Sequence, residues 1–248
     1  MKPKAATICF FHDVEQDIDS TADPERCRHV VEAFLDLERR HGVRATYNVV
    51  GKLFVEQPDL IDKIAAAGHE LAFHSFHHQS DWCSAYYAKE IRLCHAVMPL
   101  VRGYRSPRSK WDEETLLACE RAGFVWNAEA DHAAAPYWIR PSLVRIPITG
   151  DDWPLHTGKM NLAQWQQRFM TWVRERDFVA FGCHDSVISF APDERLAAWD
   201  ATLRHARAAG ATCLTFSEAQ SLAHHGWLNR LYAAVCRTLR ANYSSHAQ

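Results

Sequence analysis

Two histidines stand four residues apart in the segment 69–78, which reads HELAFHSFHH. Residues 70–73 have the length and polarity of a short buried strand, which would deliver His74 and His78 to one place. If the chain enters a helical turn at Ser75, both imidazoles lie on one face and can share a metal ion. A chain with 15 histidines also produces such a pair by chance. The pair therefore needs support from other residues.

Other polar residues with catalytic side chains follow separate expected strands. In a barrel of parallel strands, the loops at the carboxyl ends of the strands hold the chemistry. Residues from distant parts of the chain are then expected to converge on the histidine pair. They are Asp13, Glu15, Arg105, Glu129, Asp131 and His184.

Apolar periodicity and capping residues predict strands and helices in alternation. Such alternation is typical of parallel strands joined by crossover helices, in an α/β barrel or an open sheet. Residues 130–141 contain two prolines and predict an irregular loop. The expected strands cover 5–11, 43–50, 70–73, 100–104, 124–128, 143–148, 178–183 and 211–215, and the expected helices start at Pro24 and Pro58 and cover 85–97, 111–122, 161–174 and 193–209.

Composition predicts one large globular domain in a reducing compartment. The chain has 248 residues, of which 48% are hydrophobic and 23% charged. A formal net charge of −2 argues against nucleic acid as a partner. None of the eight cysteines forms a C-x-x-C pair, and the N-terminal apolar run is too short for a secretory signal. We therefore expect a cytoplasmic protein without a membrane-spanning helix.

These motifs, in this order, are similar to those of the polysaccharide deacetylase family, also called the NodB-homology domain or carbohydrate esterase family 4. The resemblance covers about residues 5–222, so residues 1–222 are expected to form one catalytic domain. The segment 42–51, GVRATYNVVG, resembles the family's second-strand segment, and 74–78, HSFHH, fits its H-[ST]-x-x-H motif. This ordered combination is far more specific than the histidine pair alone.

Later motifs also match, with departures that concern the shape of the pocket more than the reaction. The segment 105–107, RSP, fits the family's Arg-x-Pro motif, but Arg108 stands where an aromatic residue is common. His184 fits the late strand-end histidine, although FGC precedes it in place of leucines. The first motif reads HDVE in place of two adjacent aspartates.

The resemblance implies a distorted (β/α) barrel, expected to be seven-stranded, with a metal-dependent hydrolase site. His74, His78 and Glu15 are the expected ligands of Zn²⁺ or another divalent transition metal, and Asp13 the expected base. Asp13 and Glu15 lie two residues apart and face the same way in extended chain. Residues 12 and 13 can also be aligned with the family's two adjacent aspartates. In this competing assignment, Asp13 is the third ligand and His12 stands in the position of the base.

The remaining roles complete the expected site. His184 would act as the general acid, and Asp131 would orient it, with Glu129 as the next candidate. Arg105 would orient the catalytic carboxylate. Arg108, Asp152 and Trp153 are the expected substrate contacts, with the tryptophan face against a sugar ring. Each of these roles has a structural alternative. Arg105 could form a surface ion pair, and Asp131 could cap a loop. His184 could be a buried core histidine, and Trp153 a buried tryptophan in a turn.

Cys183 directly precedes His184 and could be a catalytic nucleophile instead of a buried structural thiol. Neighbours along a strand point to opposite faces, which argues against their acting together.

The leading expectation is removal of an N-acyl group, with acetyl favoured, from an amino sugar. The sugar could belong to a glycan or be nucleotide-linked or lipid-linked. Two alternatives remain, namely a deformylase or cyclic-amide hydrolase of the same fold, and a non-catalytic carbohydrate-binding relative. The sequence does not indicate an oligomeric state.

The segment 223–248 is expected to form an amphipathic helix and tail. It has no acidic residue, and its apolar positions recur at helical spacing beside three arginines. Such a helix packs on its own domain or on a second subunit, or lies in a membrane interface, which would make the protein peripheral to the inner face of a membrane. The apolar positions are Trp227, Leu228, Leu231, Tyr232, Val235 and Leu239.

Overall fold

The computed structural model describes residues 5–16, 23–78, 83–98 and 100–223. Within these ranges the strands join into one nine-stranded sheet with the order β6-β7-β5-β4-β3-β2-β1-β8, and β9 also pairs with β1. The amphipathic segment expected beyond residue 223 lies outside the described residues. The strands are β1 (Thr7–Val14), β2 (Thr46–Val49), β3 (Glu70–Phe73), β4 (Gly103–Arg105), β5 (Trp126–Ala130), β6 (Tyr137–Arg140), β7 (Leu143–Ile148), β8 (Phe178–His184) and β9 (Thr212–Cys213).

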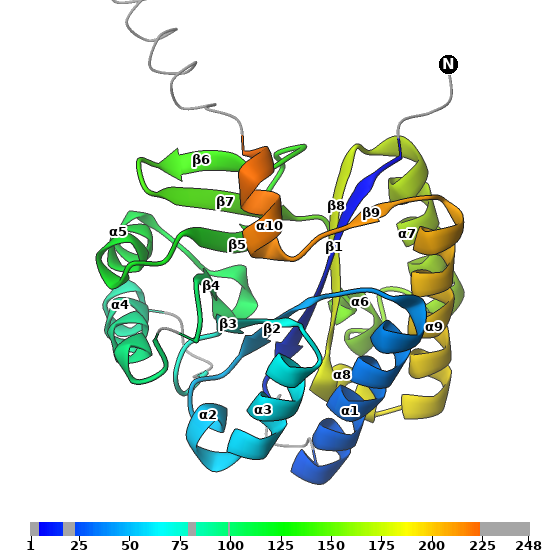
Figure 1. Cartoon of the computed structure of the whole chain (residues 1–248), viewed down its shortest axis with the longest axis horizontal. Helices are drawn as coiled ribbons and strands as arrows, with labels where there is room; N and C mark the ends of the chain where they lie inside the picture. The colour runs from blue at the N-terminus through cyan, green and yellow to red at the C-terminus, as the bar shows by residue number, and fades with distance from the viewer. Residues whose placement is uncertain (1–4, 17–22, 79–82, 99, 224–248) are drawn as a thin grey trace, which may run out of the picture.

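Helices connect the parallel strands and pack around the sheet (Figure 1). Helix α1 contacts α8 and α9, and α4 packs against α5 beside the other half of the sheet. The helices are α1 (Pro24–His41), α2 (Leu53–Glu56), α3 (Pro58–Ala66), α4 (Ser84–Arg92), α5 (Glu113–Ala122), α6 (Trp153–His156), α7 (Leu162–Glu175), α8 (Asp185–Ser189), α9 (Pro192–Ala208) and α10 (Phe216–Ala219), with short 3₁₀ turns η2 (Leu93–Ala96), η3 (Pro107–Ser109) and η4 (Gln220–Leu222).

Capping residues explain where the expected helices begin and end. The Asp23 side chain accepts a hydrogen bond from the backbone N–H of Glu25, and Pro24 stands at the first position of α1. Gly42 ends α1 in the left-handed conformation, at φ 61°. Gly123 ends α5 in the same way. The positions of α1 and α5 therefore follow from local sequence.

The alternation of side chains along β1 separates two cores. Ile8 and Phe10 belong to the large core that packs against the surrounding helices. Cys9 and Phe11 belong to a smaller cluster with residues from β5, β7 and β8. Because successive strand residues point to opposite faces, Asp13 continues the row of Cys9 and Phe11. The strand therefore delivers a carboxylate to the inner side of the curved sheet.

The expected α/β fold is confirmed. The sheet is parallel over most of its strands and does not close completely, as expected for a distorted barrel. Seven strands run parallel in the order β7-β5-β4-β3-β2-β1-β8, and β6 pairs antiparallel with β7 at one edge. Between the two ends of this series, the described chain has one parallel bridge, Gly150 with Phe181. The carboxyl ends of β1, β3, β4 and β8 therefore gather on one side of the sheet.

Two local expectations are wrong. Residues 137–140 form β6, where an irregular loop was expected, because pairing with β7 supplies the backbone hydrogen bonds. Residues 74–78 do not begin a helix, because Ser75 turns the chain at φ 64° and His78 lies at φ 51°. The histidine pair is thus brought together by a left-handed turn.

The close approach of β1 and β8 predicts the effect of a methyl group at Gly182. A Cβ there would overlap the Phe11 carbonyl oxygen and ring, so the Gly182→Ala variant must separate the two strands. We expect a loss of about 3 kcal/mol in the free energy of unfolding, measured by urea denaturation. Gly158→Ala is the control, because it meets open space and only the backbone strain of φ 67° costs about 1 kcal/mol. Equal losses in both variants would contradict the packing of β1 on β8.

Candidate active site

Strand β1 ends in two buried carboxylates that face the same region. Asp13 and Glu15 are both buried. The register of the sheet sets Asn48 of β2 and His184 of β8 on either side of Asp13. The Asn48 amide donates to Asp13 Oδ1 at 2.8 Å. Parallel pairing alone therefore places an acid between an amide donor and an imidazole.

The Glu15 carboxylate lies between the imidazoles of the histidine pair. Glu15 Oε1 is 3.0 Å from His74 Nε2 and 3.0 Å from His78 Nε2. One ligand atom from each of the three side chains lies within 4.8 Å of the others. Burial raises the pKa of Glu15, but the facing His78 and His74 outweigh it, and the pKa is held well below its usual range. Glu15 is therefore a carboxylate in this setting.

The protonation of His74 shows that this donor set fits a cation. His74 Nδ1 is 2.9 Å from the Arg105 carbonyl oxygen, which accepts only, so Nδ1 carries a proton. Nε2 is therefore the nitrogen left to bind a cation: when it carries no proton, its lone pair and a Glu15 oxygen can ligate the same ion. A tetrahedral zinc site with bonds of about 2.0–2.1 Å spaces its ligand atoms about 3.3 Å apart. Two histidines and a carboxylate at this spacing fit Zn²⁺ or a similar divalent ion.

A buried glutamate on α4 supports the turn that carries the histidines. Glu90 Oε2 accepts from the backbone N–H groups of Phe76 at 3.1 Å and His77 at 2.7 Å, and from the Ser75 hydroxyl at 3.1 Å. Glu90 Oε1 lies 3.1 Å from His77 Nδ1. Left-handed backbone is unfavourable for residues other than glycine, so Ser75 and His78 need such support. Glu90 supplies it from outside the loop.

Asp13 is held by an arginine on the neighbouring part of the sheet. Arg105 Nε donates to Asp13 Oδ2 at 2.7 Å and to Oδ1 at 3.0 Å, and Arg105 Nη1 donates to the Ser109 hydroxyl at 3.0 Å. Burial raises the pKa of Asp13, but Arg105, His74 and His184 outweigh it and lower the pKa. Asp13 is thus an oriented carboxylate with one side facing His184.

His184 bridges Asp13 and a second buried aspartate, Asp152. His184 Nδ1 lies 2.6 Å from Asp152 Oδ1, and His184 Nε2 lies 3.4 Å from Asp13 Oδ2. The His184 backbone N–H also donates to both Asp152 oxygens at 3.1 Å. Burial lowers the pKa of His184, but the charges of Asp152, Glu15 and Asp13 outweigh it and raise the pKa well above its usual value. The imidazole is therefore oriented and favoured in its protonated form.

The structure corrects the expected partner of His184. The Asp131 carboxylate accepts from the Tyr137 hydroxyl at 2.8 Å and from the Ala133 backbone N–H at 3.0 Å, so Asp131 caps its own loop. Glu129, the other candidate, accepts from the Ser106 backbone N–H at 2.8 Å. Asp152 takes the orienting position instead. It is fully buried, and this contradicts its expected role as a substrate contact.

The side chain of His12, the base in the competing assignment, points away from Asp13. His12 faces the outer core, where its Nε2 is 2.7 Å from Glu38 and its ring stacks on Phe34 at 3.9 Å. Cys183 is buried in the same outer core, and burial raises the pKa of its thiol well above the usual value. Neither residue lies on the Asp13 side of the sheet.

The two other expected substrate contacts lie at the surface. Trp153 is 37% exposed, and its ring centroid is 6.1 Å from that of His184. Arg108 is exposed in the turn after β4, at φ 55°. Trp153 therefore lies next to His184. Arg108 is in the turn that follows Arg105.

Three supporting residues carry no signal in the sequence alone. Asn48 lies within a strand and Glu90 within a helix, where polar residues are common. Asp185 follows the expected histidine, and its Oδ1 accepts from the backbone N–H groups of Glu15 at 3.0 Å and Ser186 at 2.8 Å. Only the three-dimensional packing shows that Glu90 and Asp185 hold the chain beside His74, His78 and Glu15.

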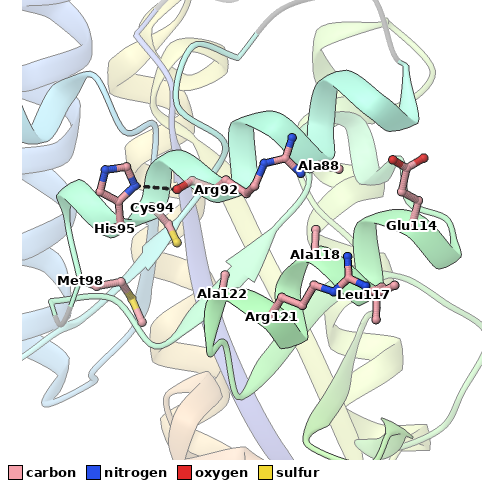
Figure 2. Close-up of a pocket in the computed structure, with 10 residues that line it drawn as sticks. All are labelled: Ala88, Arg92, Cys94, His95, Met98, Glu114, Leu117, Ala118, Arg121 and Ala122. Atoms are coloured by element: carbon pink, nitrogen blue, oxygen red, sulfur yellow. Dashed lines mark hydrogen bonds between the residues drawn. The ribbon is translucent and has the colours of Figure 1, made fainter.

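A separate hollow of about 610 Å³ lies between α4 and α5 (Figure 2). Apolar side chains line it together with the polar residues Arg92, His95, Glu114 and Arg121. The His95 ring donates to the Arg92 carbonyl oxygen at 2.7 Å, which is the dashed contact in Figure 2. None of the acids and histidines gathered at the ends of β1, β3 and β8 lines this hollow.

Sequence comparison supports the family resemblance. A model of the polysaccharide deacetylase family matches residues 15–126. A chitooligosaccharide deacetylase of Bradyrhizobium sp. (strain ANU 289) is 31% identical over 123 residues, which cover 45% of this chain and 54% of that protein. The chain thus spans about half the length of the curated relatives that it matches.

Solved structures share the fold over most of the chain. A protein of Pseudomonas aeruginosa PAO1, described as a probable polysaccharide deacetylase, superposes with a TM-score of 0.72 at 17% identity, covering 88% of this chain and 91% of that one. An allantoinase superposes with a TM-score of 0.71 at 16% identity, covering 89% and 91%. These findings confirm the expected polysaccharide deacetylase resemblance, and the fold is that of the NodB-homology, carbohydrate esterase family 4 type.

The contacts of Glu90 predict an effect on metal binding. We expect Glu90→Ala to weaken Zn²⁺ binding about 10–100-fold, because the turn that aligns His74 and His78 loses its support. Competition with a chromophoric chelator measures the dissociation constant without using activity. Glu90→Gln keeps an acceptor for the backbone N–H groups and should recover most of the affinity.

Glu114→Ala, an exposed change on α5, is the matched control. A Glu90→Ala variant that binds Zn²⁺ as tightly as the control would contradict the positioning role.

Proposed function

We propose that this protein is a metal-dependent hydrolase that removes an N-acyl group, with acetyl favoured, from an amino sugar. One observation carries the proposal: the Glu15, His74 and His78 donor set lies directly beside the Asp13–His184 pair. The chitooligosaccharide deacetylase relative supports a glycan amide as the substrate. A glycan is therefore favoured over a nucleotide-linked or lipid-linked amino sugar.

A divalent ion held by Glu15, His74 and His78 would polarise the amide carbonyl and lower the pKa of a water molecule. Asp13, held as a carboxylate by Arg105, accepts a proton from the attacking water as the new C–O bond forms. His184 Nε2 then donates a proton to the nitrogen as the C–N bond breaks. The products are a carboxylic acid and the free amine of the sugar.

Asp152 and Arg105 complete this mechanism by positioning. Asp152 accepts a hydrogen bond from His184 Nδ1–H, which turns Nε2 toward Asp13. Arg105 fixes the Asp13 carboxylate and leaves Oδ2 facing His184. Base and acid therefore stand on one side of the metal ligands, where one amide group can reach both. We assign Arg108 to contact with the substrate at the rim.

A cyclic amide is the second candidate substrate, because the allantoinase shares this fold over most of both chains. The same residues would open a ring C–N bond without releasing a separate acid. A panel of N-acetyl-sugar, N-formyl-sugar and cyclic amide substrates separates the candidates by product. Glycan binding without release of acid or opening of a ring would favour a non-catalytic relative.

We propose that the protein lies in the cytoplasm. The described cysteines are free, and most are buried. Free thiols fit a reducing compartment such as the cytoplasm. No helix in the described ranges is long and apolar enough to span a membrane.

Removing the ion or its ligands should abolish acyl release. We expect a chelator to eliminate release of acetate from N-acetylglucosamine oligomers, and added Zn²⁺ to restore it. His74→Ala and His78→Ala should each lower kcat/KM at least 1,000-fold, on the order expected for loss of metal-assisted hydrolysis. His77→Ala, in the same turn, is the control. Wild-type rates in both ligand variants would disprove the mechanism.

The assignment of Asp152 predicts a shift in the pH profile. The charge of Asp152 raises the pKa of His184, so Asp152→Asn lowers that pKa. A general acid is lost as pH rises through its pKa, so the alkaline limb of kcat should move to lower pH. We also expect kcat at neutral pH to fall by at least about 100-fold.

Asp131→Asn is the matched control, and its pH profile should keep the wild-type alkaline limb. If Asp131→Asn moves that limb and Asp152→Asn does not, the assignment of Asp152 is wrong.

A further inference from the structure

The peptide group between Arg105 and Ser106 lies between a metal ligand and a buried acid. Its carbonyl oxygen, on Arg105, accepts a hydrogen bond from His74 Nδ1 at 2.9 Å. Its N–H, on Ser106, donates to Glu129 Oε1 at 2.8 Å. All four residues are buried. One peptide group therefore connects the Glu129 carboxyl group to the imidazole of His74.

The order of the strands explains this arrangement. Strand β4 lies between β3 and β5 in the sheet (Figure 1), and its backbone pairing with β5 ends at Arg105, opposite Ala128. The C=O and N–H of a trans peptide group point to opposite sides of the chain. The next peptide group therefore needs one partner from each neighbour. His74, directly after β3, supplies the donor, and Glu129 of β5 supplies the acceptor.

Glu129 is held against this peptide group by its own neighbour on β5. Asn127 Nδ2 donates to Glu129 Oε1 at 2.8 Å and to the Tyr104 carbonyl oxygen at 3.2 Å. Within the described part of the chain, the buried Glu129 Oε2 has no hydrogen-bond partner. Burial raises the pKa of Glu129 to about 7, although the charges of Arg105 and Arg145 lower it in part. Above neutral pH the side chain is therefore a carboxylate whose hydrogen bonds converge on Oε1.

We propose that Glu129 tunes the metal ligand His74 through the Arg105–Ser106 peptide group. A carboxylate polarises the N–H from which it accepts, and hydrogen bonds in a chain strengthen one another, so the carbonyl oxygen becomes a stronger acceptor. A stronger hydrogen bond from His74 Nδ1–H shifts electron density toward Nε2, the nitrogen left to bind a cation. Glu129 touches neither substrate nor ion, so it is a positioning residue. This tuning rests on the metal ligands of the proposed function and not on its substrate.

Replacing the acid by its amide separates the charge of Glu129 from its shape. Glu129→Gln keeps an oxygen that accepts from the Ser106 N–H but removes the charge. We expect it to weaken Zn²⁺ binding about threefold to tenfold at about pH 8, because an indirect partner should matter no more than a direct one. Glu129→Ala should weaken binding further, because the Ser106 N–H is then buried without a partner. Competition of the full-length protein with a chromophoric chelator measures each dissociation constant.

The pH dependence of this difference is specific to the charge. Protonated Glu129 has no charge, so the wild type and Glu129→Gln should bind Zn²⁺ nearly alike at about pH 6, and the difference should grow as the pH rises through about 7. The other groups that face Glu129 do not titrate in this range, because arginines stay protonated and burial raises the pKa of the tyrosines and the cysteine. They are Arg105 and Tyr104 of β4, Arg145 of β7, Tyr87 of α4 and Cys119 of α5.

NMR of the zinc-loaded protein follows the hydrogen bond itself. A weaker hydrogen bond moves the resonance of the ring proton on His74 Nδ1 to lower chemical shift, and we expect this change in Glu129→Gln. Asp131→Asn is the matched control, because it removes a carboxylate two positions further along that caps its own loop. Thermal unfolding checks that each variant is folded.

Wild-type zinc affinity and an unchanged His74 ring-proton resonance in Glu129→Gln at about pH 8 would overturn the tuning. Weak binding by Glu129→Ala alone would then show a purely structural role. An equal loss of affinity in Asp131→Asn, or a loss in Glu129→Gln that is the same at both pH values, would also overturn it.

Acetate release from N-acetylglucosamine oligomers is measured in parallel, so that the two proposals fail separately. Zinc binding that responds to Glu129→Gln, without acetate release by the wild type, supports the tuning and contradicts the hydrolase. Acetate release with no effect of Glu129→Gln on zinc binding contradicts the tuning alone.

Discussion

The buried carboxylates at the end of β1 can remain charged only because positive groups face them. Burying an isolated carboxylate is costly, and Asp13 and Glu15 are buried within a few ångströms of each other. Arg105 compensates Asp13, and the imidazoles of His74 and His78 compensate Glu15 in their protonated form. A divalent ion would complete this balance, which is why the site suits a cation and why binding it should stabilise the fold. The register of β1 with β2 and β8 sets this arrangement, since it fixes which strand ends meet.

Buried acids outside the reacting groups determine the geometry of the site. Glu90 holds the left-handed turn between the histidines, and Asp185 holds the backbone of Glu15. Asp152 fixes His184 through both its ring and its backbone. Each acid lies on a different element, so α4, α8 and the segment before α6 all contribute. The arrangement of reactive side chains is thus a property of the packed fold.

The sequence predicts the site best where local rules decide the outcome. Caps at Asp23 and Gly42 define α1, and spacing within β1 puts Asp13 and Glu15 on one face while His12 faces away. Matches of ordered motifs select the fold correctly. Local spacing gave no means to choose between Asp131 and Asp152, because both are loop acids far from His184 in sequence.

Tertiary contacts also explain the other departures. Residues 137–140 form a strand because β7 is available for pairing, although two prolines flank them. The turn at Ser75 takes a left-handed conformation because Glu90 approaches from α4. These features need knowledge of neighbours distant in the chain.

Anomalous X-ray diffraction at the zinc absorption edge, from crystals of the zinc-loaded protein, would locate an ion at Glu15, His74 and His78. We expect one strong peak about 2.0–2.2 Å from a Glu15 carboxylate oxygen, His74 Nε2 and His78 Nε2. The Asp13 carboxylate should remain on Arg105, outside bonding distance. A peak bonded to Asp13 in place of Glu15, or one away from both histidines, would show that this ligand assignment is wrong.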